Sequence, residues 1–271
     1  MNSENIRSNR KKYIKSALVL LIVIALLLFC NFQNKHLETT HYTYEAEQLG
    51  VDLDGYRIVQ ISDLHNAKFG KNNQKLVDRV RECDPDMIVL TGDLVDSNHT
   101  NVDRAVQFVD EIVKICPVYY VTGNHEYWLD TSEYEKLMDG LASAGMIILD
   151  DQVVEISRGD AKFRLVGLDD KSLADGTLEA LLSDEKELTV VLAHEPQYLA
   201  RYAGTGVDLV LSGHAHGGQF RLPFVGGIVA PDQGFLPEYT AGEYYMNGTE
   251  MIVSRGLGLS LIHISEPTRL L

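Results

Sequence analysis

Seven side chains suited to binding divalent metal ions lie in five short blocks of the sequence, each directly after an apolar run. All offer oxygen or nitrogen donors, which suit Mn²⁺, iron, Zn²⁺ or Mg²⁺. None is a thiolate, which excludes a structural zinc site of the cysteine type. Any one of them could instead be a turn former, a helix cap or a core histidine, but together they favour a metal site. These candidate ligands are Asp63, His65, Asp93, Asn124, His194, His214 and His216.

Two of the histidines, His214 and His216, stand one residue apart in the stretch SGHAHGGQ. In an extended segment, residues i and i+2 point to the same face, so both imidazoles should project together. The glycines around them allow other groups to approach the backbone closely. We expect these glycines to keep the lip of the site clear.

The elements that must position these residues follow an α/β rhythm. The apolar runs YRIVQISD, DMIVLTGD and VYYVTGN each end on a candidate ligand, and helical periodicity separates them at 72–82 and 102–114, with a further helix at 132–144. Continuous apolar strands alternating with helices indicate buried parallel strands. In such sheets the functional crevice lies beyond the carboxyl ends of the strands.

The second half of the chain, from about residue 146, contains more strands and fewer helices. The runs VVEIS, FRLVGL, LTVVLAH and DLVLSGH read as strands, and shorter ones follow at QFRLPF, EYYMN and EMIVSRG. Two of these runs again end on a candidate ligand, His194 or His214. We therefore expect one α/β domain with two sheets packed face to face and helices outside, as a four-layer α/β/β/α sandwich.

Taken together, the blocks resemble the calcineurin-like metallophosphoesterase superfamily over residues 55–258. The blocks are D-x-H at 63–65, G-D-x-x-D at 92–96, G-N-H-E at 123–126, a lone His194 and G-H-x-H at 213–216. SRGLG at 254–258 and GHAHGGQ further resemble a bacterial, membrane-associated branch. The resemblance implies the calcineurin-like fold of two mixed sheets and a centre of two divalent metal ions, about 4 Å apart.

The resemblance also implies a role for each block. One ion would be held by Asp63, His65 and His216, and the other by Asn124, His194 and His214. Asp93 would bridge the two ions, and His125 would be the general acid that protonates the leaving group.

The implied activity is the hydrolysis of phosphomonoesters or phosphodiesters, including lipid or cell-envelope substrates, by a metal-bridging hydroxide. The alternative is a non-catalytic, metal-dependent binder of phosphorylated ligands. Asp96 and Glu126 would orient histidines or be solvated loop acids, and Arg255 would contact phosphate or be a surface charge. Trp128 would either wall the substrate pocket or pack in the core.

The N-terminus predicts a membrane anchor. Residues 1–15 carry five bases and one acid, although the whole chain has a net charge of −15. An apolar segment at 16–32 follows, and the basic side of such a segment stays in the cytoplasm. We expect a cytoplasmic tail at 1–15, a single-pass anchor at 16–32, a tether at 33–50 and an extracytoplasmic catalytic domain at 51–258. A twin-arginine export signal at 10–15 is the alternative. The acidic body argues against nucleic acid as a routine partner.

Three further segments yield expectations. Residues 222–239 are apolar and rich in Gly and Pro, and could form a rim that meets lipid. Cys83 and Cys116 could be buried thiols or a disulfide, because no spacing pattern decides. Residues 259–271 resemble a translated sequencing adaptor, and we expect them to be no part of the natural fold.

Overall fold

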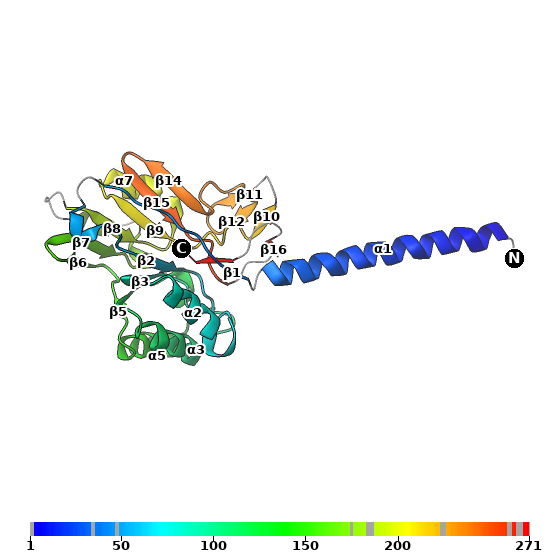
Figure 1. Ribbon diagram of the computed structural model, residues 1–271, viewed down its shortest axis with the longest axis horizontal. Helices are drawn as coiled ribbons and strands as arrows, with labels where there is room; N and C mark the ends of the chain where they lie inside the picture. The colour runs from blue at the N-terminus through cyan, green and yellow to red at the C-terminus, as the bar shows by residue number, and fades with distance from the viewer. Residues whose placement is uncertain are drawn as a thin grey trace.

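The domain is a four-layer α/β/β/α sandwich from which one long helix projects (Figure 1). The computed structural model describes residues 3–33, 36–46, 49–173, 176–182, 187–222, 226–258, 262–263 and 268–270. The predicted fold class is confirmed, with a four-stranded sheet facing a six-stranded sheet.

The first sheet is built from the first half of the chain, and its four strands run parallel. Its order is β2 (Ile58–Ile61), β3 (Met87–Thr91), β4 (Val118–Val121) and β5 (Ile147–Ile148). Helices α2 (Gln74–Glu82), α3 (Val102–Ile112) and α5 (Thr131–Ser143) cover its outer face (Figure 1). Side-chain caps fix two helix starts: Asn101 accepts a hydrogen bond from the Arg104 N–H, and Asp130 accepts one from the Glu133 N–H.

The second sheet is mixed, with antiparallel strands at both edges and parallel strands between them. Helices α6 (Thr177–Leu181) and α7 (Leu199–Gly204) pack on its outer face. Its order is β14 (Gly242–Met246), β15 (Thr249–Val253), β9 (Leu209–Ser212), β8 (Thr189–Leu192), β7 (Ala161–Gly167) and β6 (Gln152–Arg158).

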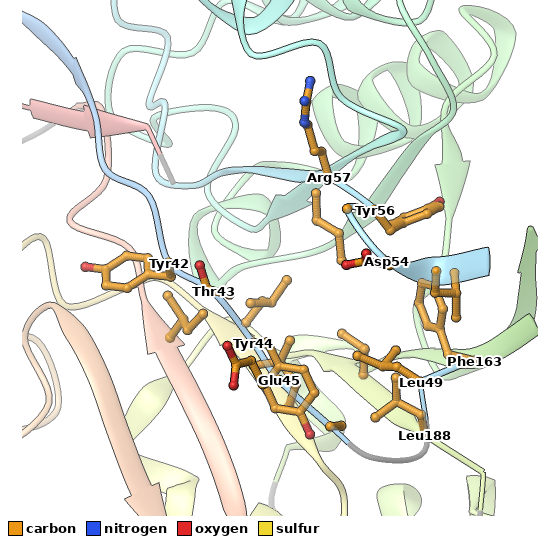
Figure 2. A pocket seen from close by; sticks show the side chains of 18 of the residues that line it. Tyr42, Thr43, Tyr44, Glu45, Leu49, Asp54, Tyr56, Arg57, Phe163 and Leu188 are labelled. Atoms are coloured by element: carbon orange, nitrogen blue, oxygen red, sulfur yellow. The ribbon is translucent and has the colours of Figure 1, made fainter. Parts of the chain in front are cut away.

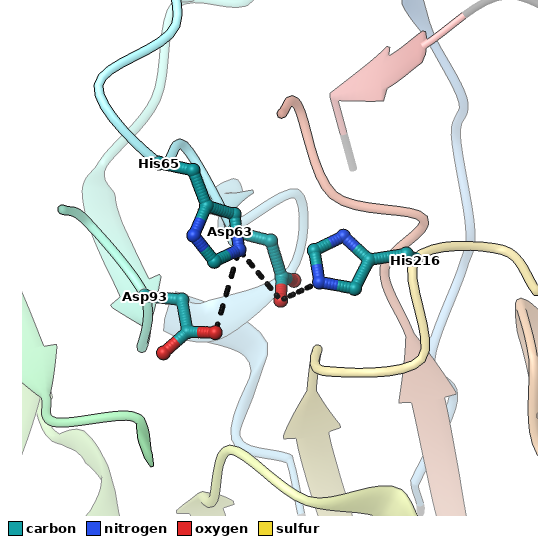
Figure 3. A group of neighbouring side chains, drawn as sticks. All are labelled: Asp63, His65, Asp93 and His216. Carbon is teal, nitrogen blue, oxygen red and sulfur yellow. Dashed lines mark ion pairs between the residues drawn. The ribbon is translucent and has the colours of Figure 1, made fainter. Parts of the chain in front are cut away.

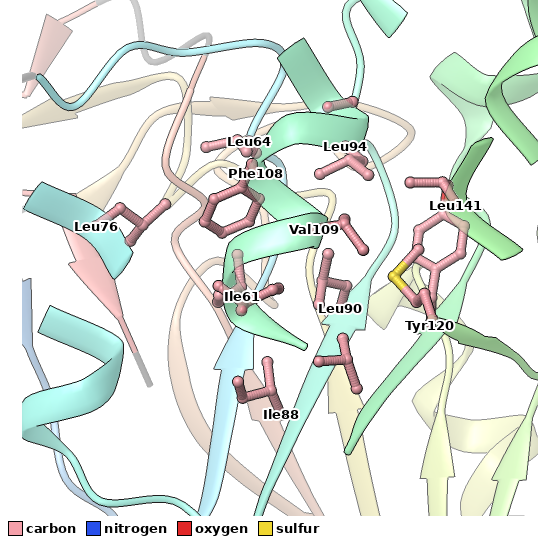
Figure 4. Close-up of a cluster of buried hydrophobic side chains, with 14 of the residues drawn as sticks. Ile61, Leu64, Leu76, Ile88, Leu90, Leu94, Phe108, Val109, Tyr120 and Leu141 are labelled. Atoms are coloured by element: carbon pink, nitrogen blue, oxygen red, sulfur yellow. The ribbon is translucent and has the colours of Figure 1, made fainter. Parts of the chain in front are cut away.

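Three apolar clusters separate the four layers. The first lies between the parallel sheet and its helices, where Phe108, Leu90 and Tyr120 are fully or almost fully buried (Figure 4). The second fills the space between the sheets, and the third lies beneath α6 and α7. The buried amide of Gln60 joins the sheets, since it donates to Thr91 Oγ1 and to the Ser212 carbonyl, each at 2.9 Å.

The N-terminal helix α1 (Ser3–Gln33) contains one stretch, Asn9–Phe29, that is long and apolar enough to cross a membrane. After β1 (Leu37–Thr39), residues 40–46 run along the domain, and Leu49 lies against it as well. Tyr42, Tyr44 and Leu49 pack against the cluster between the sheets. Much of the segment expected to be a tether therefore acts as a strap on the domain.

The strap covers a cavity of about 770 Å³ whose lining is mainly apolar (Figure 2). Tyr44, Phe163, Leu188 and Ile252 are among its lining residues, and none of the candidate metal ligands is. The cavity is therefore a feature of the core between the sheets and lies apart from the chemistry considered below.

The short helix α4 (Asn124–Tyr127) follows β4, and the remaining short strands lie in the last quarter of the chain. Within the described residues Cys83 and Cys116 are free thiols. Positions 259–261, 264–267 and 271 of the expected non-native tail lie outside those residues. The short strands are β10 (Phe220–Leu222), β11 (Gly226–Gly227), β12 (Val229–Ala230), β13 (Gly234–Phe235), β16 (Ile262–His263) and β17 (Thr268–Leu270).

Candidate metal centre

Each candidate ligand follows the carboxyl end of a strand, and the two sheets bring these ends together. Five of the seven have a left-handed backbone, which is uncommon for residues other than glycine and costs on the order of 1–3 kcal/mol each. Such strain is typical of functional sites, because only a constrained surrounding structure can maintain it. The five residues, with φ between 46° and 64°, are Asp63, His65, Asp93, His214 and His216.

One group of donors consists of Asp63, His65, Asp93 and His216, all buried (Figure 3). His65 Nε2 lies 3.4 Å from Asp93 Oδ2 and 4.0 Å from Asp63 Oδ1. His216 Nε2 lies 3.6 Å from the same Asp63 oxygen. Four donor atoms from three separate blocks thus face a common centre.

A second group consists of Asp93, His194 and His214, with Asn124 beside them. His194 Nε2 is 3.3 Å from Asp93 Oδ2 and 3.1 Å from Asn124 Oδ1. His214 Nδ1 is 3.1 Å from the same amide oxygen. Asp93 therefore belongs to both groups, and all seven candidate ligands gather at one edge of the sandwich.

Hydrogen bonds on the far side of two rings turn one unprotonated nitrogen towards the centre. His194 Nδ1 donates to the Thr91 carbonyl at 2.8 Å, and His216 Nδ1 donates to the Gly258 carbonyl at 3.2 Å. In each neutral ring this leaves Nε2 free to bind a cation.

Unsatisfied buried atoms provide an independent test of whether a cation fits. Within the described residues, both ring nitrogens of His65 and Asp93 Oδ2 are buried without a hydrogen-bond partner. Buried polar atoms are seldom left unpaired, because each costs about 1–3 kcal/mol. Divalent ions coordinated by His65 Nε2 and Asp93 Oδ2 would remove that penalty at these two atoms, so the residues fit the metal that the donor set implies.

Charge within the centre is strongly coupled. Burial opposes the charge of Asp93, but the neighbouring His194 and His65 outweigh it and hold the pKa of this carboxyl well below its usual range. Burial likewise opposes charge on His194, yet Asp93 raises its pKa well above the usual value. Burial lowers the pKa of His65, and lowers that of His214 to about 4 with help from His194. The Asp93 carboxylate is thus ionised and His65 and His214 are neutral, whereas His194 shares a proton with Asp93 that a bound cation would have to displace.

The candidate acid His125 lies beside the first group, with its ring centroid 4.5 Å from that of His65. The Ser97 backbone N–H donates to His125 Nδ1 at 3.2 Å, so the proton of the neutral ring resides on Nε2. Burial lowers the pKa of His125. The ring centroid of Trp128 lies 4.7 Å from that of His125. Trp128 is 63% exposed, so the prediction that it packs in the core is wrong.

The two neighbouring acids differ from each other in what they touch. Glu126 is fully buried and accepts hydrogen bonds from the backbone N–H groups of Asp93, Gly123 and Val95, at 2.8–3.2 Å. It therefore holds the loop backbones together and orients no histidine, and burial raises its pKa to about 8. Asp96 Oδ1 is 3.7 Å from His125 Nδ1.

Sequence reasoning missed one residue that touches a candidate ligand. Asp232 Oδ2 lies 2.9 Å from His214 Nε2, although 18 residues separate the two in sequence. Asp232 follows no strand of the main sheets, and the only local signal is a turn-like P-D-Q-G stretch. Arg255, considered above as a surface charge, is only 8% exposed.

Comparison with known proteins agrees with this geometry. The family model of calcineurin-like phosphoesterases matches residues 56–218, more than half of the chain. The chain therefore belongs to the calcineurin-like phosphoesterase family, and it is a metal-dependent phosphoesterase, a hydrolase. The resemblance drawn from the five blocks is confirmed.

Particular relatives cover most of the chain. An uncharacterized metallophosphoesterase of Aquifex aeolicus is 33% identical over 92% of this chain and 94% of its own length. The phosphodiesterase YaeI of Escherichia coli is 30% identical over 75% of each chain. A transmembrane protein with a metallophosphoesterase domain from Danio rerio is 29% identical over 74% of this chain and 49% of its own.

Proposed function

We propose that this protein hydrolyses phosphomonoesters or phosphodiesters with two divalent metal ions. Asp63, His65 and His216 would hold one ion, and Asn124, His194 and His214 the other. One observation carries the proposal: Asp93 Oδ2 lies 3.4 Å from His65 Nε2 and 3.3 Å from His194 Nε2. A carboxylate oxygen that reaches both groups of donors supports a ligand shared by two ions.

The residues of the chain divide the remaining work. Divalent ions held there would supply a hydroxide nucleophile near neutral pH and positive charge for the phosphoryl group. His125, charged as the imidazolium, would donate its Nε2 proton to the leaving-group oxygen and become neutral. The proton that stays on Nδ1 has Ser97 Oγ at 3.1 Å and Asp96 Oδ1 at 3.7 Å as nearby acceptors. Trp128, exposed beside His125, would form a wall against which the leaving group packs.

A lipid or cell-envelope phosphoester is the substrate class that we favour. The relative YaeI is named a phosphodiesterase, and α1 of this chain is long enough to span a membrane. In the loop expected to form a lipid-facing rim, Phe235 and Leu236 are 73% and 60% exposed. Exposed apolar side chains in a chain with a candidate membrane-spanning helix support access to a lipid head group.

The test is turnover by the full chain in detergent with added Mn²⁺. A chromogenic monoester, a chromogenic diester and a short-chain phospholipid should separate the substrate classes. His125→Ala should keep its bound Mn²⁺ and slow turnover by about 10²–10⁴-fold. If the wild-type protein binds Mn²⁺ but cleaves no ester, the non-catalytic binder replaces this proposal.

We further propose that the protein is a single-pass membrane protein with its N-terminus in the cytoplasm and its catalytic domain outside. The bases at residues 7–15, before the apolar stretch, support this orientation. Protease added to intact spheroplasts should digest the domain, whereas protection of the domain until the cells are lysed would reverse the orientation.

A further inference from the structure

The ring of His214 is oriented differently from those of His194 and His216. Those two rings turn Nε2 to the centre and are fixed by backbone carbonyls. His214 turns Nδ1 towards the centre, where it lies 3.1 Å from Asn124 Oδ1 and 3.2 Å from His194 Nε2. Its Nε2 faces outward, and Asp232 Oδ2 lies 2.9 Å from it.

We propose that Asp232 is a positioning residue that fixes the tautomer and orientation of His214 for the second metal ion. This inference rests on the dinuclear centre of the proposed function. The Asp232 carboxylate can only accept a hydrogen bond, so His214 Nε2 must carry the proton and Nδ1 must be the free donor. A carboxylate behind a metal-binding imidazole also raises the basicity of the ring.

The surrounding loop is built to hold Asp232 at this point. The main chain at Asp232 is left-handed, with φ of 53°. Gln233, the next residue, clamps the loop, because its side chain both donates to and accepts from the backbone of Tyr239, each at 2.8 Å. The Leu236 N–H donates to the Ile228 carbonyl at 2.7 Å, which closes the hairpin of β12 and β13.

The glycines of SGHAHGGQ allow this loop to reach the site. A Cβ added to Gly218 would clash with the backbone of Gly227, and one added to Gly227 would lie 2.8 Å from Gly218 Cα. We had expected these glycines to keep the lip of the site clear. Instead, Gly218 brings its backbone into contact with that of Gly227. The contact brings the segment that carries Asp232 against the loop that carries His214.

Glu195 is the other acid near this ring. One ligand atom from each of Glu195, His214 and Asp232 lies within 4.8 Å of the others, a grouping that could also hold a cation. For His214 to bind such a cation, Nε2 would have to give up its proton while Nδ1 served the second ion. The hydrogen bond to Asp232 requires no such loss, and we favour it.

Mn²⁺ titration of the metal-stripped full chain in detergent, followed calorimetrically, tests this role without relying on activity. Asp232→Ala should weaken one of two Mn²⁺ sites by about 10–100-fold and leave the other unchanged. Asp232→Asn, which keeps an acceptor oxygen, should recover most of the lost affinity. Glu243→Ala, which removes an exposed acid on β14, is the matched control and should bind like wild type. Equal metal-free melting temperatures would show that the variants fold.

The possible failures are distinguishable. If the wild type binds two Mn²⁺ ions and Asp232→Ala binds both equally well, the positioning role is wrong and the proposed function stands. Three Mn²⁺ in the wild type and two in Asp232→Ala would make Asp232 a ligand of a third ion and overturn the inference. A wild-type protein that takes up no divalent ion overturns both.

Discussion

The two oxygens of Asp93 have different partners, and this makes the variant Asp93→Asn informative. Oδ1 accepts a hydrogen bond from the backbone N–H of His125 at 2.9 Å. Oδ2 has no hydrogen-bond partner among the described residues and faces His65 and His194. In the variant, the amide oxygen would keep the His125 N–H, and the amide NH₂ would replace Oδ2. An amide nitrogen has no lone pair to offer a cation, so the shared ligand would be lost.

The size of the effect follows from these contacts. The amide could present its oxygen to the metal ions only by rotating. Its NH₂ would then face the backbone N–H of His125 and leave that buried group unpaired, at a cost of about 1–3 kcal/mol. The variant therefore cannot easily restore the ligand. Loss of one preorganised electrostatic contact typically slows an enzyme by about 10²–10³-fold, equivalent to roughly 3–4 kcal/mol. Loss of a ligand shared by two ions should slow turnover by an amount at the upper end of that range or beyond it.

The assay compares Mn²⁺-dependent ester hydrolysis and bound Mn²⁺ in the wild type and Asp93→Asn, both as full chains in detergent. Circular dichroism should match, because the substitution preserves shape and the bond to the His125 backbone N–H. The metal-free melting temperature should fall, because the amide cannot pair with His194 as the carboxylate does. Asp78→Asn, at an exposed position on α2, controls for the loss of one charge. Wild-type turnover by Asp93→Asn, with two Mn²⁺ bound, would refute a shared carboxylate.

Three further predictions concern stability. Glu126→Ala leaves three buried N–H groups unpaired and should lower the free energy of unfolding by about 3–5 kcal/mol in urea titrations; a loss below 1 kcal/mol would contradict its role in holding the loops. Burial raises the pKa of Asp150 to about 7, so the folded state retains this proton while the unfolded chain loses it, and stability should fall from about pH 4 to pH 7, by at most about 4 kcal/mol. Asp150→Asn should reduce that slope, with Glu126 and Glu195 still contributing to it, and identical pH profiles of stability for the variant and the wild type would contradict the effect. Free Mn²⁺ at about 100 times its dissociation constant should stabilise the fold by about 2.7 kcal/mol, seen as a melting temperature that falls on chelation; no change on chelation would indicate an empty centre.

Local patterns predicted the part of the fold that periodicity controls. The runs ending at Asp63, Asp93 and Asn124 became β2, β3 and β4, and the predicted helices became α2, α3 and α5 within a few residues. Buried parallel strands are continuously apolar, and the first polar residue after each one marks its end. The same rule brought the candidate ligands to one edge, because the ends of parallel strands meet there.

Features that depend on packing between distant segments could not be predicted from local sequence patterns. The strap at 36–46 is polar enough to read as a tether, yet Tyr42 and Tyr44 pack between the sheets. Asp232 belongs to no periodic element, and its contact with His214 needs the close approach of Gly218 and Gly227. In the sequence, Glu126 is recognisable only as an acid next to the candidate general acid His125. Its three backbone partners come together only when the loops fold. In each case the missing information was a contact between distant parts of the chain.

The glycine that precedes a ligand in these blocks serves a ligand from a different block. A Cβ at Gly123 would clash with the carboxylate of Asp93, and a Cβ at Gly213 would lie 2.5 Å from Asp63 Oδ2. Each block therefore leaves room for the donor of another, and the blocks can close around the centre only together. This interlocking explains why the pairs G-N and G-H indicate a metal site better than either residue alone. The second residue supplies a donor atom, and the glycine leaves space for a donor from another block. A larger residue at either glycine should disturb a ligand outside its own block while leaving its neighbour intact.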